Sequence, residues 1–231
     1  MCTDPSMPFA TPAAGSAIRS RRAPAPGPFV VGLVGPAGAG KSTVARALEA
    51  DGARVLDGDR LGHDVANLDP EVRAALIAEY GTQVYGSDGT LDRKQVAARV
   101  FTDPAALARL NQLVHPRILA RLRDGIAQAT RDGFTGAVVV DAALLLDWSF
   151  ERECDAVLAV LAPSEQQVER LVATRGWSVD EARKRLASAR RSESFAAAAD
   201  EVIMNDGSEA QAVAKARAAL LRLRAARTGA A

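Results

Sequence analysis

Short apolar runs rich in valine alternate along the chain with longer segments in which apolar residues recur at helical spacing. Continuous apolar runs are typical of strands buried on both faces, and their alternation with helices indicates a parallel sheet covered by helices on both sides. Five runs are predicted as strands: Phe29–Val34, Ala53–Asp57, Ala137–Asp141, Ala156–Leu161 and Glu201–Met204. The pattern therefore predicts an α/β fold.

Several helix starts carry recognisable capping residues. Two Asp-Pro pairs, beginning at Asp69 and Asp103, each place a side-chain acceptor before a proline at the first helical position. Ser178 and Glu181 have the spacing of a capping box. We therefore expect helices to begin directly after Asp69, Asp103 and Ser178.

The stretch between the second and third predicted strands, 61–135, has helical periodicity and no convincing strand. A connection of this length is far longer than a plain crossover between parallel strands. We predict a helical insertion over the edge of the sheet at which the strands end. Ligands bind at that edge in open α/β folds.

The sequence GPAGAGKST, Gly35–Thr43, follows the first predicted strand and precedes a helix. It fits G-x-x-x-x-G-K-[ST], and we call it the phosphate loop. Its glycines allow the backbone N–H groups to point at phosphate oxygens, and the helix adds its positive end. Lys41 is expected to neutralise the β- and γ-phosphates, and Ser42 to bind Mg²⁺. The residues predicted to hold the nucleotide here are Gly35, Ala37, Gly38, Ala39, Gly40, Lys41, Ser42 and Thr43.

Binding alone does not decide whether the triphosphate is a switch, a fuel or a phosphoryl donor. A kinase, which uses it as a donor, needs a carboxylate that accepts the proton of the attacking hydroxyl. The second predicted strand ends in VLDGDRLGHDV, which brings Asp57 and Asp59 to the same edge of the sheet as the phosphate loop. Asp59 is the better candidate, because it lies just past the strand. For each aspartate the alternative is that it caps the next helix. No N-K-x-D motif of a guanine-nucleotide switch is present.

Composition narrows the classes of partner. The 231 residues fit one domain with a small insertion, and 29 Lys and Arg nearly balance 28 Asp and Glu. This balance gives no general attraction to nucleic acid or membranes. Cys2 and Cys154 are too few for a disulfide framework, so reduced thiols and a cytoplasmic location are expected. The expected partner is a small molecule; nothing in the sequence indicates an oligomeric state.

Residues 1–28 contain six of the eleven prolines, and such a segment buries too little apolar area to fold. We predict a disordered tail. Its arginines, Arg19, Arg21 and Arg22, leave a transit peptide as an alternative.

Further motifs resemble the dephospho-CoA kinase family in chain order from Val31 to Gly207. The phosphate loop is followed by VLDGDRLGHDV, where the family has Asp-x-Asp. The block YGTQVYGSDGTLDRKQVAARVFTDPAALARLNQLVHPRI is similar to the family's helical substrate domain, and ADEVIMNDG resembles its A-D-x-V-I-x-N-x-G element. The middle block is the most specific of the three.

The resemblance implies a three-layer P-loop kinase fold with a five-stranded parallel sheet of order 2-3-1-4-5. It implies a nucleotide-binding core (29–60, 136–163 and 199–228), a helical substrate-binding (CoA) domain (61–135) and a lid (164–198). The implied reaction transfers the γ-phosphate of ATP, with Mg²⁺, to the ribose 3′-hydroxyl of dephospho-CoA. This is the final step of coenzyme A biosynthesis.

The resemblance also assigns roles to individual residues. It makes Asp59 the general base or orienting acceptor and places His115, Arg117 and Leu91 near the acceptor nucleotide. Without the resemblance, His115 reads as a structural histidine that precedes a turn.

On the donor side, Asn205 and Gly207 are implied to border the adenine. Among the arginines of the lid, Arg170 and Arg185 are expected to touch phosphate. Asp141, at the end of the third strand, either holds Mg²⁺ through water or makes a structural hydrogen bond.

The sequence departs from the family pattern at a few positions. DAALLLDW lacks the family's proline and has Asp147 where a glutamate is usual. In the lid, the usual arginine–aspartate pair is Thr174-Arg175, and Ala189 and Phe195 replace a glutamine and a lysine. Two alternatives therefore stay open: a P-loop kinase of another nucleoside or small alcohol, and a nucleotide-binding regulator without transfer activity.

Overall fold

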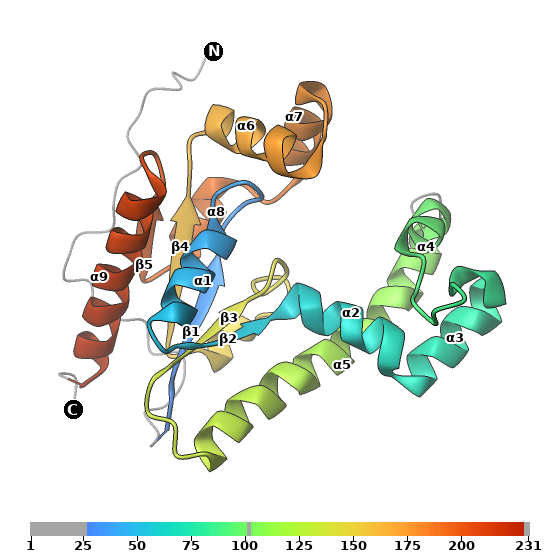
Figure 1. Ribbon diagram of the computed structural model, residues 1–231, viewed down its shortest axis with the longest axis horizontal. Helices are drawn as coiled ribbons and strands as arrows, with labels where there is room; N and C mark the ends of the chain where they lie inside the picture. The colour runs from blue at the N-terminus through green and yellow to red at the C-terminus, as the bar shows by residue number, and fades with distance from the viewer. Residues whose placement is uncertain (1–26, 101–102, 229–231) are drawn as a thin grey trace. The chain divides into compact units, whose positions relative to one another are not determined.

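The computed structural model describes residues 27–100 and 103–228 (Figure 1). These residues form two compact units. One contains the described residues up to Val55 together with those from Asp132 onward, and the other is Leu56–Arg131. Apart from Gly27 and Pro28, the predicted tail lies outside the described residues, as does Cys2.

Five strands form one sheet in the order β2-β3-β1-β4-β5, so the predicted strand order is confirmed. The strands are β1 (Phe29–Val34), β2 (Arg54–Asp57), β3 (Ala137–Asp141), β4 (Ala156–Leu161) and β5 (Glu201–Met204). The pairs β1–β3, β1–β4 and β4–β5 are parallel. Only β2 differs from its predicted bounds, because Ala53 N–H donates to the Leu48 carbonyl (2.9 Å) and closes the preceding helix.

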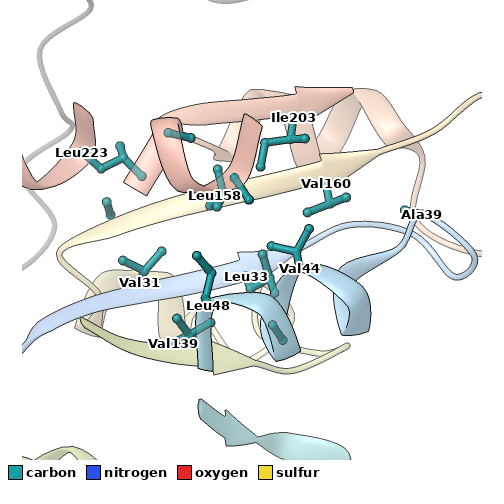
Figure 2. Packing of buried hydrophobic residues seen from close by; sticks show 14 of the residues in the cluster. Val31, Leu33, Ala39, Val44, Leu48, Val139, Leu158, Val160, Ile203 and Leu223 are labelled. Atoms are coloured by element: carbon teal, nitrogen blue, oxygen red, sulfur yellow. The ribbon is translucent and has the colours of Figure 1, made fainter. Parts of the chain in front are cut away.

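Helices α1 (Lys41–Ala50) and α9 (Glu209–Thr228) pack on one face of the sheet. Figure 2 shows that alternate residues of β1, such as Val31 and Leu33, point into this layer, where they meet Leu48 of α1. Alternate positions along a strand point to opposite faces. Gly32, which lies between Val31 and Leu33, therefore faces the other side of the sheet.

The other face of the sheet is covered by the segment after β3, which includes the 3₁₀ helix η2 (Phe150–Glu153), and by α8 (Ser192–Ala198) alongside β4. A Cβ on Gly32 would lie 3.1 Å from Leu145 Cδ1 and 3.3 Å from Cys154 Sγ, so a glycine lets this segment pack closely. Cys154 is buried here, and its thiol donates to the Phe150 carbonyl (3.5 Å).

A buried ion pair anchors the end of α9 to the start of the sheet. Asp155 Oδ2 accepts from the backbone N–H of Val30 (2.7 Å) and from Arg227 Nη1 (2.6 Å). The side chain of Asp155 is only 1% exposed and that of Arg227 is 18% exposed. Removing one partner of such a pair leaves the other charge buried without compensation.

We therefore expect Asp155→Ala to lower the free energy of unfolding by about 3–5 kcal/mol. Arg222→Ala on the same helix is the matched control. It breaks an ion pair with Glu201 in which the arginine is 56% exposed, and such pairs contribute about 1 kcal/mol or less. Urea denaturation of both variants measures the difference. Equal midpoints in the two variants would contradict a stabilising role for Asp155.

The unit Leu56–Arg131 is helical, as the periodicity predicts. It contains α2 (Gly58–Leu68), α3 (Pro70–Tyr80), the 3₁₀ helix η1 (Thr82–Val84), α4 (Arg93–Val100) and α5 (Pro104–Arg131). Helices α2 and α5 pack closely, and a Cβ on Gly62 would lie 3.2 Å from Ile118 Cδ1. Tyr85 and Leu91 form an isolated antiparallel bridge.

The capping residues act as expected. Asp69 accepts from the N–H groups of Glu71 and Val72, and Asp103 accepts from the N–H of Ala105.

Two further helices, α6 (Ser164–Arg175) and α7 (Val179–Ser188), follow β4. Gly176 ends α6 in the left-handed conformation (φ 66°), and Ser178 caps α7 by accepting from Glu181 N–H (3.1 Å). Buried Val168, Leu171 and Ala182 hold the two helices together. This helical pair and α8 make up the segment 164–198 that is expected as the lid.

Candidate active site

The phosphate loop connects β1 to α1 in a conformation that needs glycine. Gly35, Gly38 and Gly40 have φ values of 147°, 73° and 99°, which L side chains rarely adopt. A Cβ on Gly35 would lie 2.1 Å from the Val160 carbonyl oxygen of β4. The loop therefore folds tightly against the sheet and leaves a backbone cradle at the start of α1.

The N-terminus of α1 is suited to an anion. Its N-cap, Gly40, makes no side-chain capping hydrogen bond, and the first turn contains no acidic residue. The N–H groups there keep their donor capacity, and the helix dipole adds positive potential. Lys41 Nζ lies at the same place, where it donates to the carbonyls of Gly35 (2.8 Å) and Pro36 (3.3 Å). These groups fit the phosphates of a nucleotide.

Asp141 and Ser42, the residues expected to hold Mg²⁺, lie at the end of β3 and in the first turn of α1. Asp141 ends β3 in register with Leu33 of β1, and its side chain points to the face of the sheet on which Val139 packs against α1. Ser42 is exposed in the first turn of α1. No cluster of three His, Cys, Asp or Glu side chains suited to a metal occurs in 27–100 or 103–228. Magnesium in kinases typically needs only one or two protein ligands besides phosphate and water, so this pair fits it.

The predicted adenine-side residues lie directly after β5. Asn205 is buried, and its Nδ2 donates to the Ala39 carbonyl of the phosphate loop (2.8 Å). Between Asn205 and Gly207, the Asp206 carboxylate accepts from Lys215 Nζ (3.0 Å), and this hydrogen bond lowers the pKa of Asp206. A Cβ on Gly207 would meet Gln211 Oε1 at 2.1 Å.

Arg170 and Arg185, the two arginines expected to touch phosphate, make different contacts. Arg170, on α6, donates to the loop carbonyls of Gly38 (3.3 Å) and Ala39 (3.4 Å). Arg185, on α7, donates to Glu181 and stacks over the ring of Trp177 at 4.4 Å. Arg185 therefore contacts only residues of its own segment in these hydrogen bonds and this stacking contact, whereas Arg170 lies against the phosphate loop.

Two contacts in this unit could not be predicted from the sequence. Arg190 Nη2 donates to Asp147 Oδ1 (2.6 Å), so the residue that replaces the family's glutamate pairs with an arginine just after α7. A Cβ on Gly38 would lie 2.7 Å from the backbone carbonyl of Gln167, so the loop also packs against α6. Both contacts join segments distant in sequence, and no local motif signals them.

In the other unit, the structure separates the roles of the two aspartates after β2. Asp57 is the N-cap of α2, and its Oδ1 accepts from the N–H groups of Asp59 (2.9 Å) and Arg60 (3.0 Å). Asp59 is exposed in the first turn of the same helix. The capping alternative is therefore correct for Asp57, whereas Asp59 lies in the first turn and is not the N-cap.

Arg117 on α5 is held by acidic groups at the start of α3. Its Nε lies 3.3 Å from Asp69 Oδ2, and its Nη2 donates to Glu71. The pKa of Asp69 is lowered mainly by the hydrogen bond from Val72 N–H, and the positive charge of Arg117 adds to this effect. Asp69 therefore stays ionised beside Arg117 at neutral pH.

His115 does not precede a turn, so that expectation is wrong. His115 and Pro116 both lie inside α5. Proline removes one bond of the helix ladder, but the helix continues because Ile118 and Leu122 are buried beyond it. Arg117 Nη1 also donates to the Leu113 carbonyl (2.8 Å) beside the interruption.

Leu91, the last of the residues expected near the acceptor nucleotide, lies in a turn that is hydrogen-bonded to α2. Its N–H donates to Asn67 Oδ1 (2.7 Å), and Arg73 binds the carbonyls of Asn67 and Gly89 from α3. Tyr85, opposite Leu91, donates its hydroxyl to the Ala66 carbonyl (2.7 Å). The turn is therefore held in one conformation by side chains that the sequence analysis did not single out.

Comparison with known proteins identifies the family. A family model described as dephospho-CoA kinase matches residues 29–211. The chain belongs to the dephospho-CoA kinase family. A dephospho-CoA kinase of Deinococcus radiodurans is 44% identical over 190 residues, which cover 80% of this chain and 90% of the relative. The dephospho-CoA kinase of Thermobifida fusca is 40% identical over 180 residues, with 78% and 88% covered.

Two solved structures share the fold of this chain. A crystal structure of a Thermus thermophilus protein has a TM-score of 0.72 at 31% identity, covering 84% of this chain and 97% of that one. Dephospho-CoA kinase from Campylobacter jejuni, at 19% identity, shares the fold with a TM-score of 0.59, covering 84% and 96% of the two chains.

These comparisons confirm the predicted family, P-loop kinase fold, enzyme class and function, and ATP is the phosphoryl donor that this kinase family implies. A separate finding concerns membranes: no described helix has the length and apolar character required for a membrane span.

Proposed function

We propose that the phosphate loop holds ATP and Mg²⁺ while Asp59 directs the ribose 3′-hydroxyl of dephospho-CoA at the γ-phosphate. The observation that carries this proposal is the N-terminus of α1, where uncapped N–H groups, Lys41 and the glycine cradle meet. Positioning and charge stabilisation supply most of the acceleration in phosphoryl transfer. A site of this kind needs few groups that do covalent chemistry.

In the proposed reaction the 3′-oxygen forms a bond to the γ-phosphorus, and the bond from that phosphorus to the β–γ bridging oxygen breaks. The hydroxyl proton goes to the Asp59 carboxylate, and ADP leaves with the bridging oxygen. Lys41 neutralises charge on the β- and γ-oxygens. The products are coenzyme A and ADP.

Ser42 and Asp141 are the residues we propose for Mg²⁺, Ser42 directly and Asp141 through water. When bound, Mg²⁺ would neutralise phosphate charge and help to orient the γ-phosphate. Gly207, after β5, is proposed to border the adenine.

We assign the acceptor nucleotide to the unit Leu56–Arg131, with Leu91, His115 and Arg117 lining its site beside Asp59. The network of Asp69 and Glu71 around Arg117 supports this assignment, because it holds a guanidinium in one place. A fixed guanidinium suits the phosphates of an acceptor nucleotide.

We propose the segment 164–198, which contains α6, α7 and α8, as the lid, with Arg185 reaching phosphate when it closes. Arg185 is 54% exposed, and its partner Glu181 lies on the same helix, so the arginine can change partner without unfolding α7. Closure would exclude water and limit ATP hydrolysis.

We also propose a cytoplasmic location, because ATP-dependent biosynthesis depends on a ready supply of ATP.

A substrate panel tests this function. We expect ADP release, followed with a coupled assay, to be at least about 100-fold faster with dephospho-CoA than with pantetheine derivatives or free nucleosides. Phosphorus NMR of the product should place the new phosphate on the ribose 3′-oxygen. Faster turnover of a nucleoside or small alcohol would support another P-loop kinase, and ATP binding without any product would support a regulator.

A further inference from the structure

Behind the phosphate loop lies a set of side chains that bind its backbone rather than facing a ligand. We propose that Asn205 and Arg170 are positioning residues that fix the direction of the loop's peptide groups, and we call them the loop brace. The inference rests on the proposed function only in taking the loop as the phosphate site. It assigns Asn205 a role other than contact with adenine.

Asn205 is fixed in place before it reaches the loop. Its backbone N–H donates to the Leu161 carbonyl (2.7 Å), which continues the β4–β5 pairing beyond the strands. The residue is 6% exposed, and its Nδ2 donates to the Ala39 carbonyl (2.8 Å). The donor is thus held rigidly by the sheet.

Arg170 reaches the same carbonyl from α6. Its Nη1 lies 3.4 Å from the Ala39 carbonyl oxygen and 3.3 Å from that of Gly38. Its Nη2 donates to the Asn205 carbonyl (3.1 Å) and to Gln166 Oε1 (3.0 Å). The guanidinium therefore joins the loop, α6 and the end of β5.

Gly40 makes room for the loop brace. A Cβ on Gly40 would lie 2.3 Å from Asn205 Nδ2 and 3.9 Å from Arg170 Nη1. Real Cβ atoms do not approach an amide nitrogen so closely, so any side chain at Gly40 would displace Asn205. The close approach gives Gly40 a second reason to be glycine, besides its φ of 99°.

The brace acts on the donor site through peptide geometry. In a trans peptide, the C=O of one residue and the N–H of the next point in opposite directions. Because the Ala39 carbonyl is turned toward Asn205, the N–H of Gly40 points away from it. Two donors on one buried carbonyl thus hold a phosphate-binding N–H in its orientation, and Arg170 adds a positive charge behind the loop.

The proposal is tested by measuring separately how well variants of Asn205 bind the triphosphate and the adenine base. Asn205→Asp keeps the size of the side chain but removes the donor, and Asn205→Ala removes the side chain. We expect each variant to weaken the binding of ATP and of inorganic triphosphate equally, by a factor of about 10 measured by calorimetry, because the buried Ala39 carbonyl loses the closer of its two donors. Adenosine affinity and the preference for ATP over GTP should not change.

Kinetics give a second readout. The variants should raise KM for ATP and leave KM for dephospho-CoA within about twofold, since the brace touches only the donor loop. Arg170→Met should have the same effects. The affinity for ATP in the double variant of Asn205 and Arg170 should fall by less than the product of the two single effects, because both side chains donate to the Ala39 carbonyl. Glu169→Ala, exposed on the same helix, is the matched control.

Thermal unfolding of each variant shows that it is folded before binding is measured. Unchanged affinity for inorganic triphosphate in the folded Asn205→Asp protein would overturn the brace, and so would an altered ATP to GTP preference, which would assign Asn205 to the base. These are binding measurements with the donor alone. They therefore give an answer even if dephospho-CoA proves not to be the acceptor.

Discussion

Asp59→Asn is expected to lower kcat by about 10²–10⁴-fold, because the amide has nearly the same shape as the carboxylate but cannot take up the hydroxyl proton. Asp59 is exposed in the first turn of α2, where an asparagine keeps the helix intact. The affinity for ATP should stay the same, since the phosphate loop is unaltered. Steady-state kinetics and calorimetry with ATP measure the two quantities separately.

The neighbouring Asp57→Asn is the matched control. Asp57 caps α2 through Oδ1, and asparagine caps helices about as well as aspartate, so this variant should retain near wild-type kcat. A loss of kcat in Asp57→Asn as large as in Asp59→Asn would show that the pair acts together. Full activity in Asp59→Asn would remove Asp59 from the mechanism.

Lys41→Ala should lower kcat by about 10²–10³-fold and also weaken ATP binding. The ammonium group starts α1 beside the cradle, and in the proposed reaction it stabilises the charge that develops on the transferred phosphoryl group. Arg217→Ala, which removes a positive charge from α9 opposite Asp51, serves as the control for the general loss of charge. It should leave both quantities unchanged.

Calorimetry with ATP and with adenosine sharpens the Lys41 prediction. The loss of affinity should appear with ATP and be absent with adenosine, which has no phosphate. An equal loss with both ligands would mean that the substitution disturbs the whole site rather than the phosphate contact.

Local patterns predicted the sheet and the phosphate loop because each is set by neighbouring residues. Four of the five strands have the predicted bounds, since runs such as those of β1 and β4 are apolar throughout and end at glycine, proline or aspartate. The cap residues Asp69 and Ser178 were predicted for the same reason, because a capping bond spans only two or three residues.

Local sequence patterns did not predict the contacts between residues that are far apart in the chain. Nothing near Asn205 or Arg170 in sequence shows that both donate to Ala39, more than 100 residues away in the chain. For His115 the alternative interpretation placed a turn after it, but the residue lies inside α5. The burial of Ile118 and Leu122 carries α5 through that position. The aspartate pair was left open because the choice between capping and catalysis depends on where α2 begins.

In the proposed mechanism the Asp59 carboxylate orients the acceptor hydroxyl toward a phosphate held by the phosphate loop. A crystal structure with dephospho-CoA, Mg²⁺ and a non-hydrolysable ATP analogue is the decisive measurement. We expect an Asp59 carboxylate oxygen at about 2.6–3.2 Å from the ribose 3′-oxygen, with that oxygen in line with the γ-phosphorus. A 3′-oxygen bound by another residue and turned away from Asp59 would contradict it.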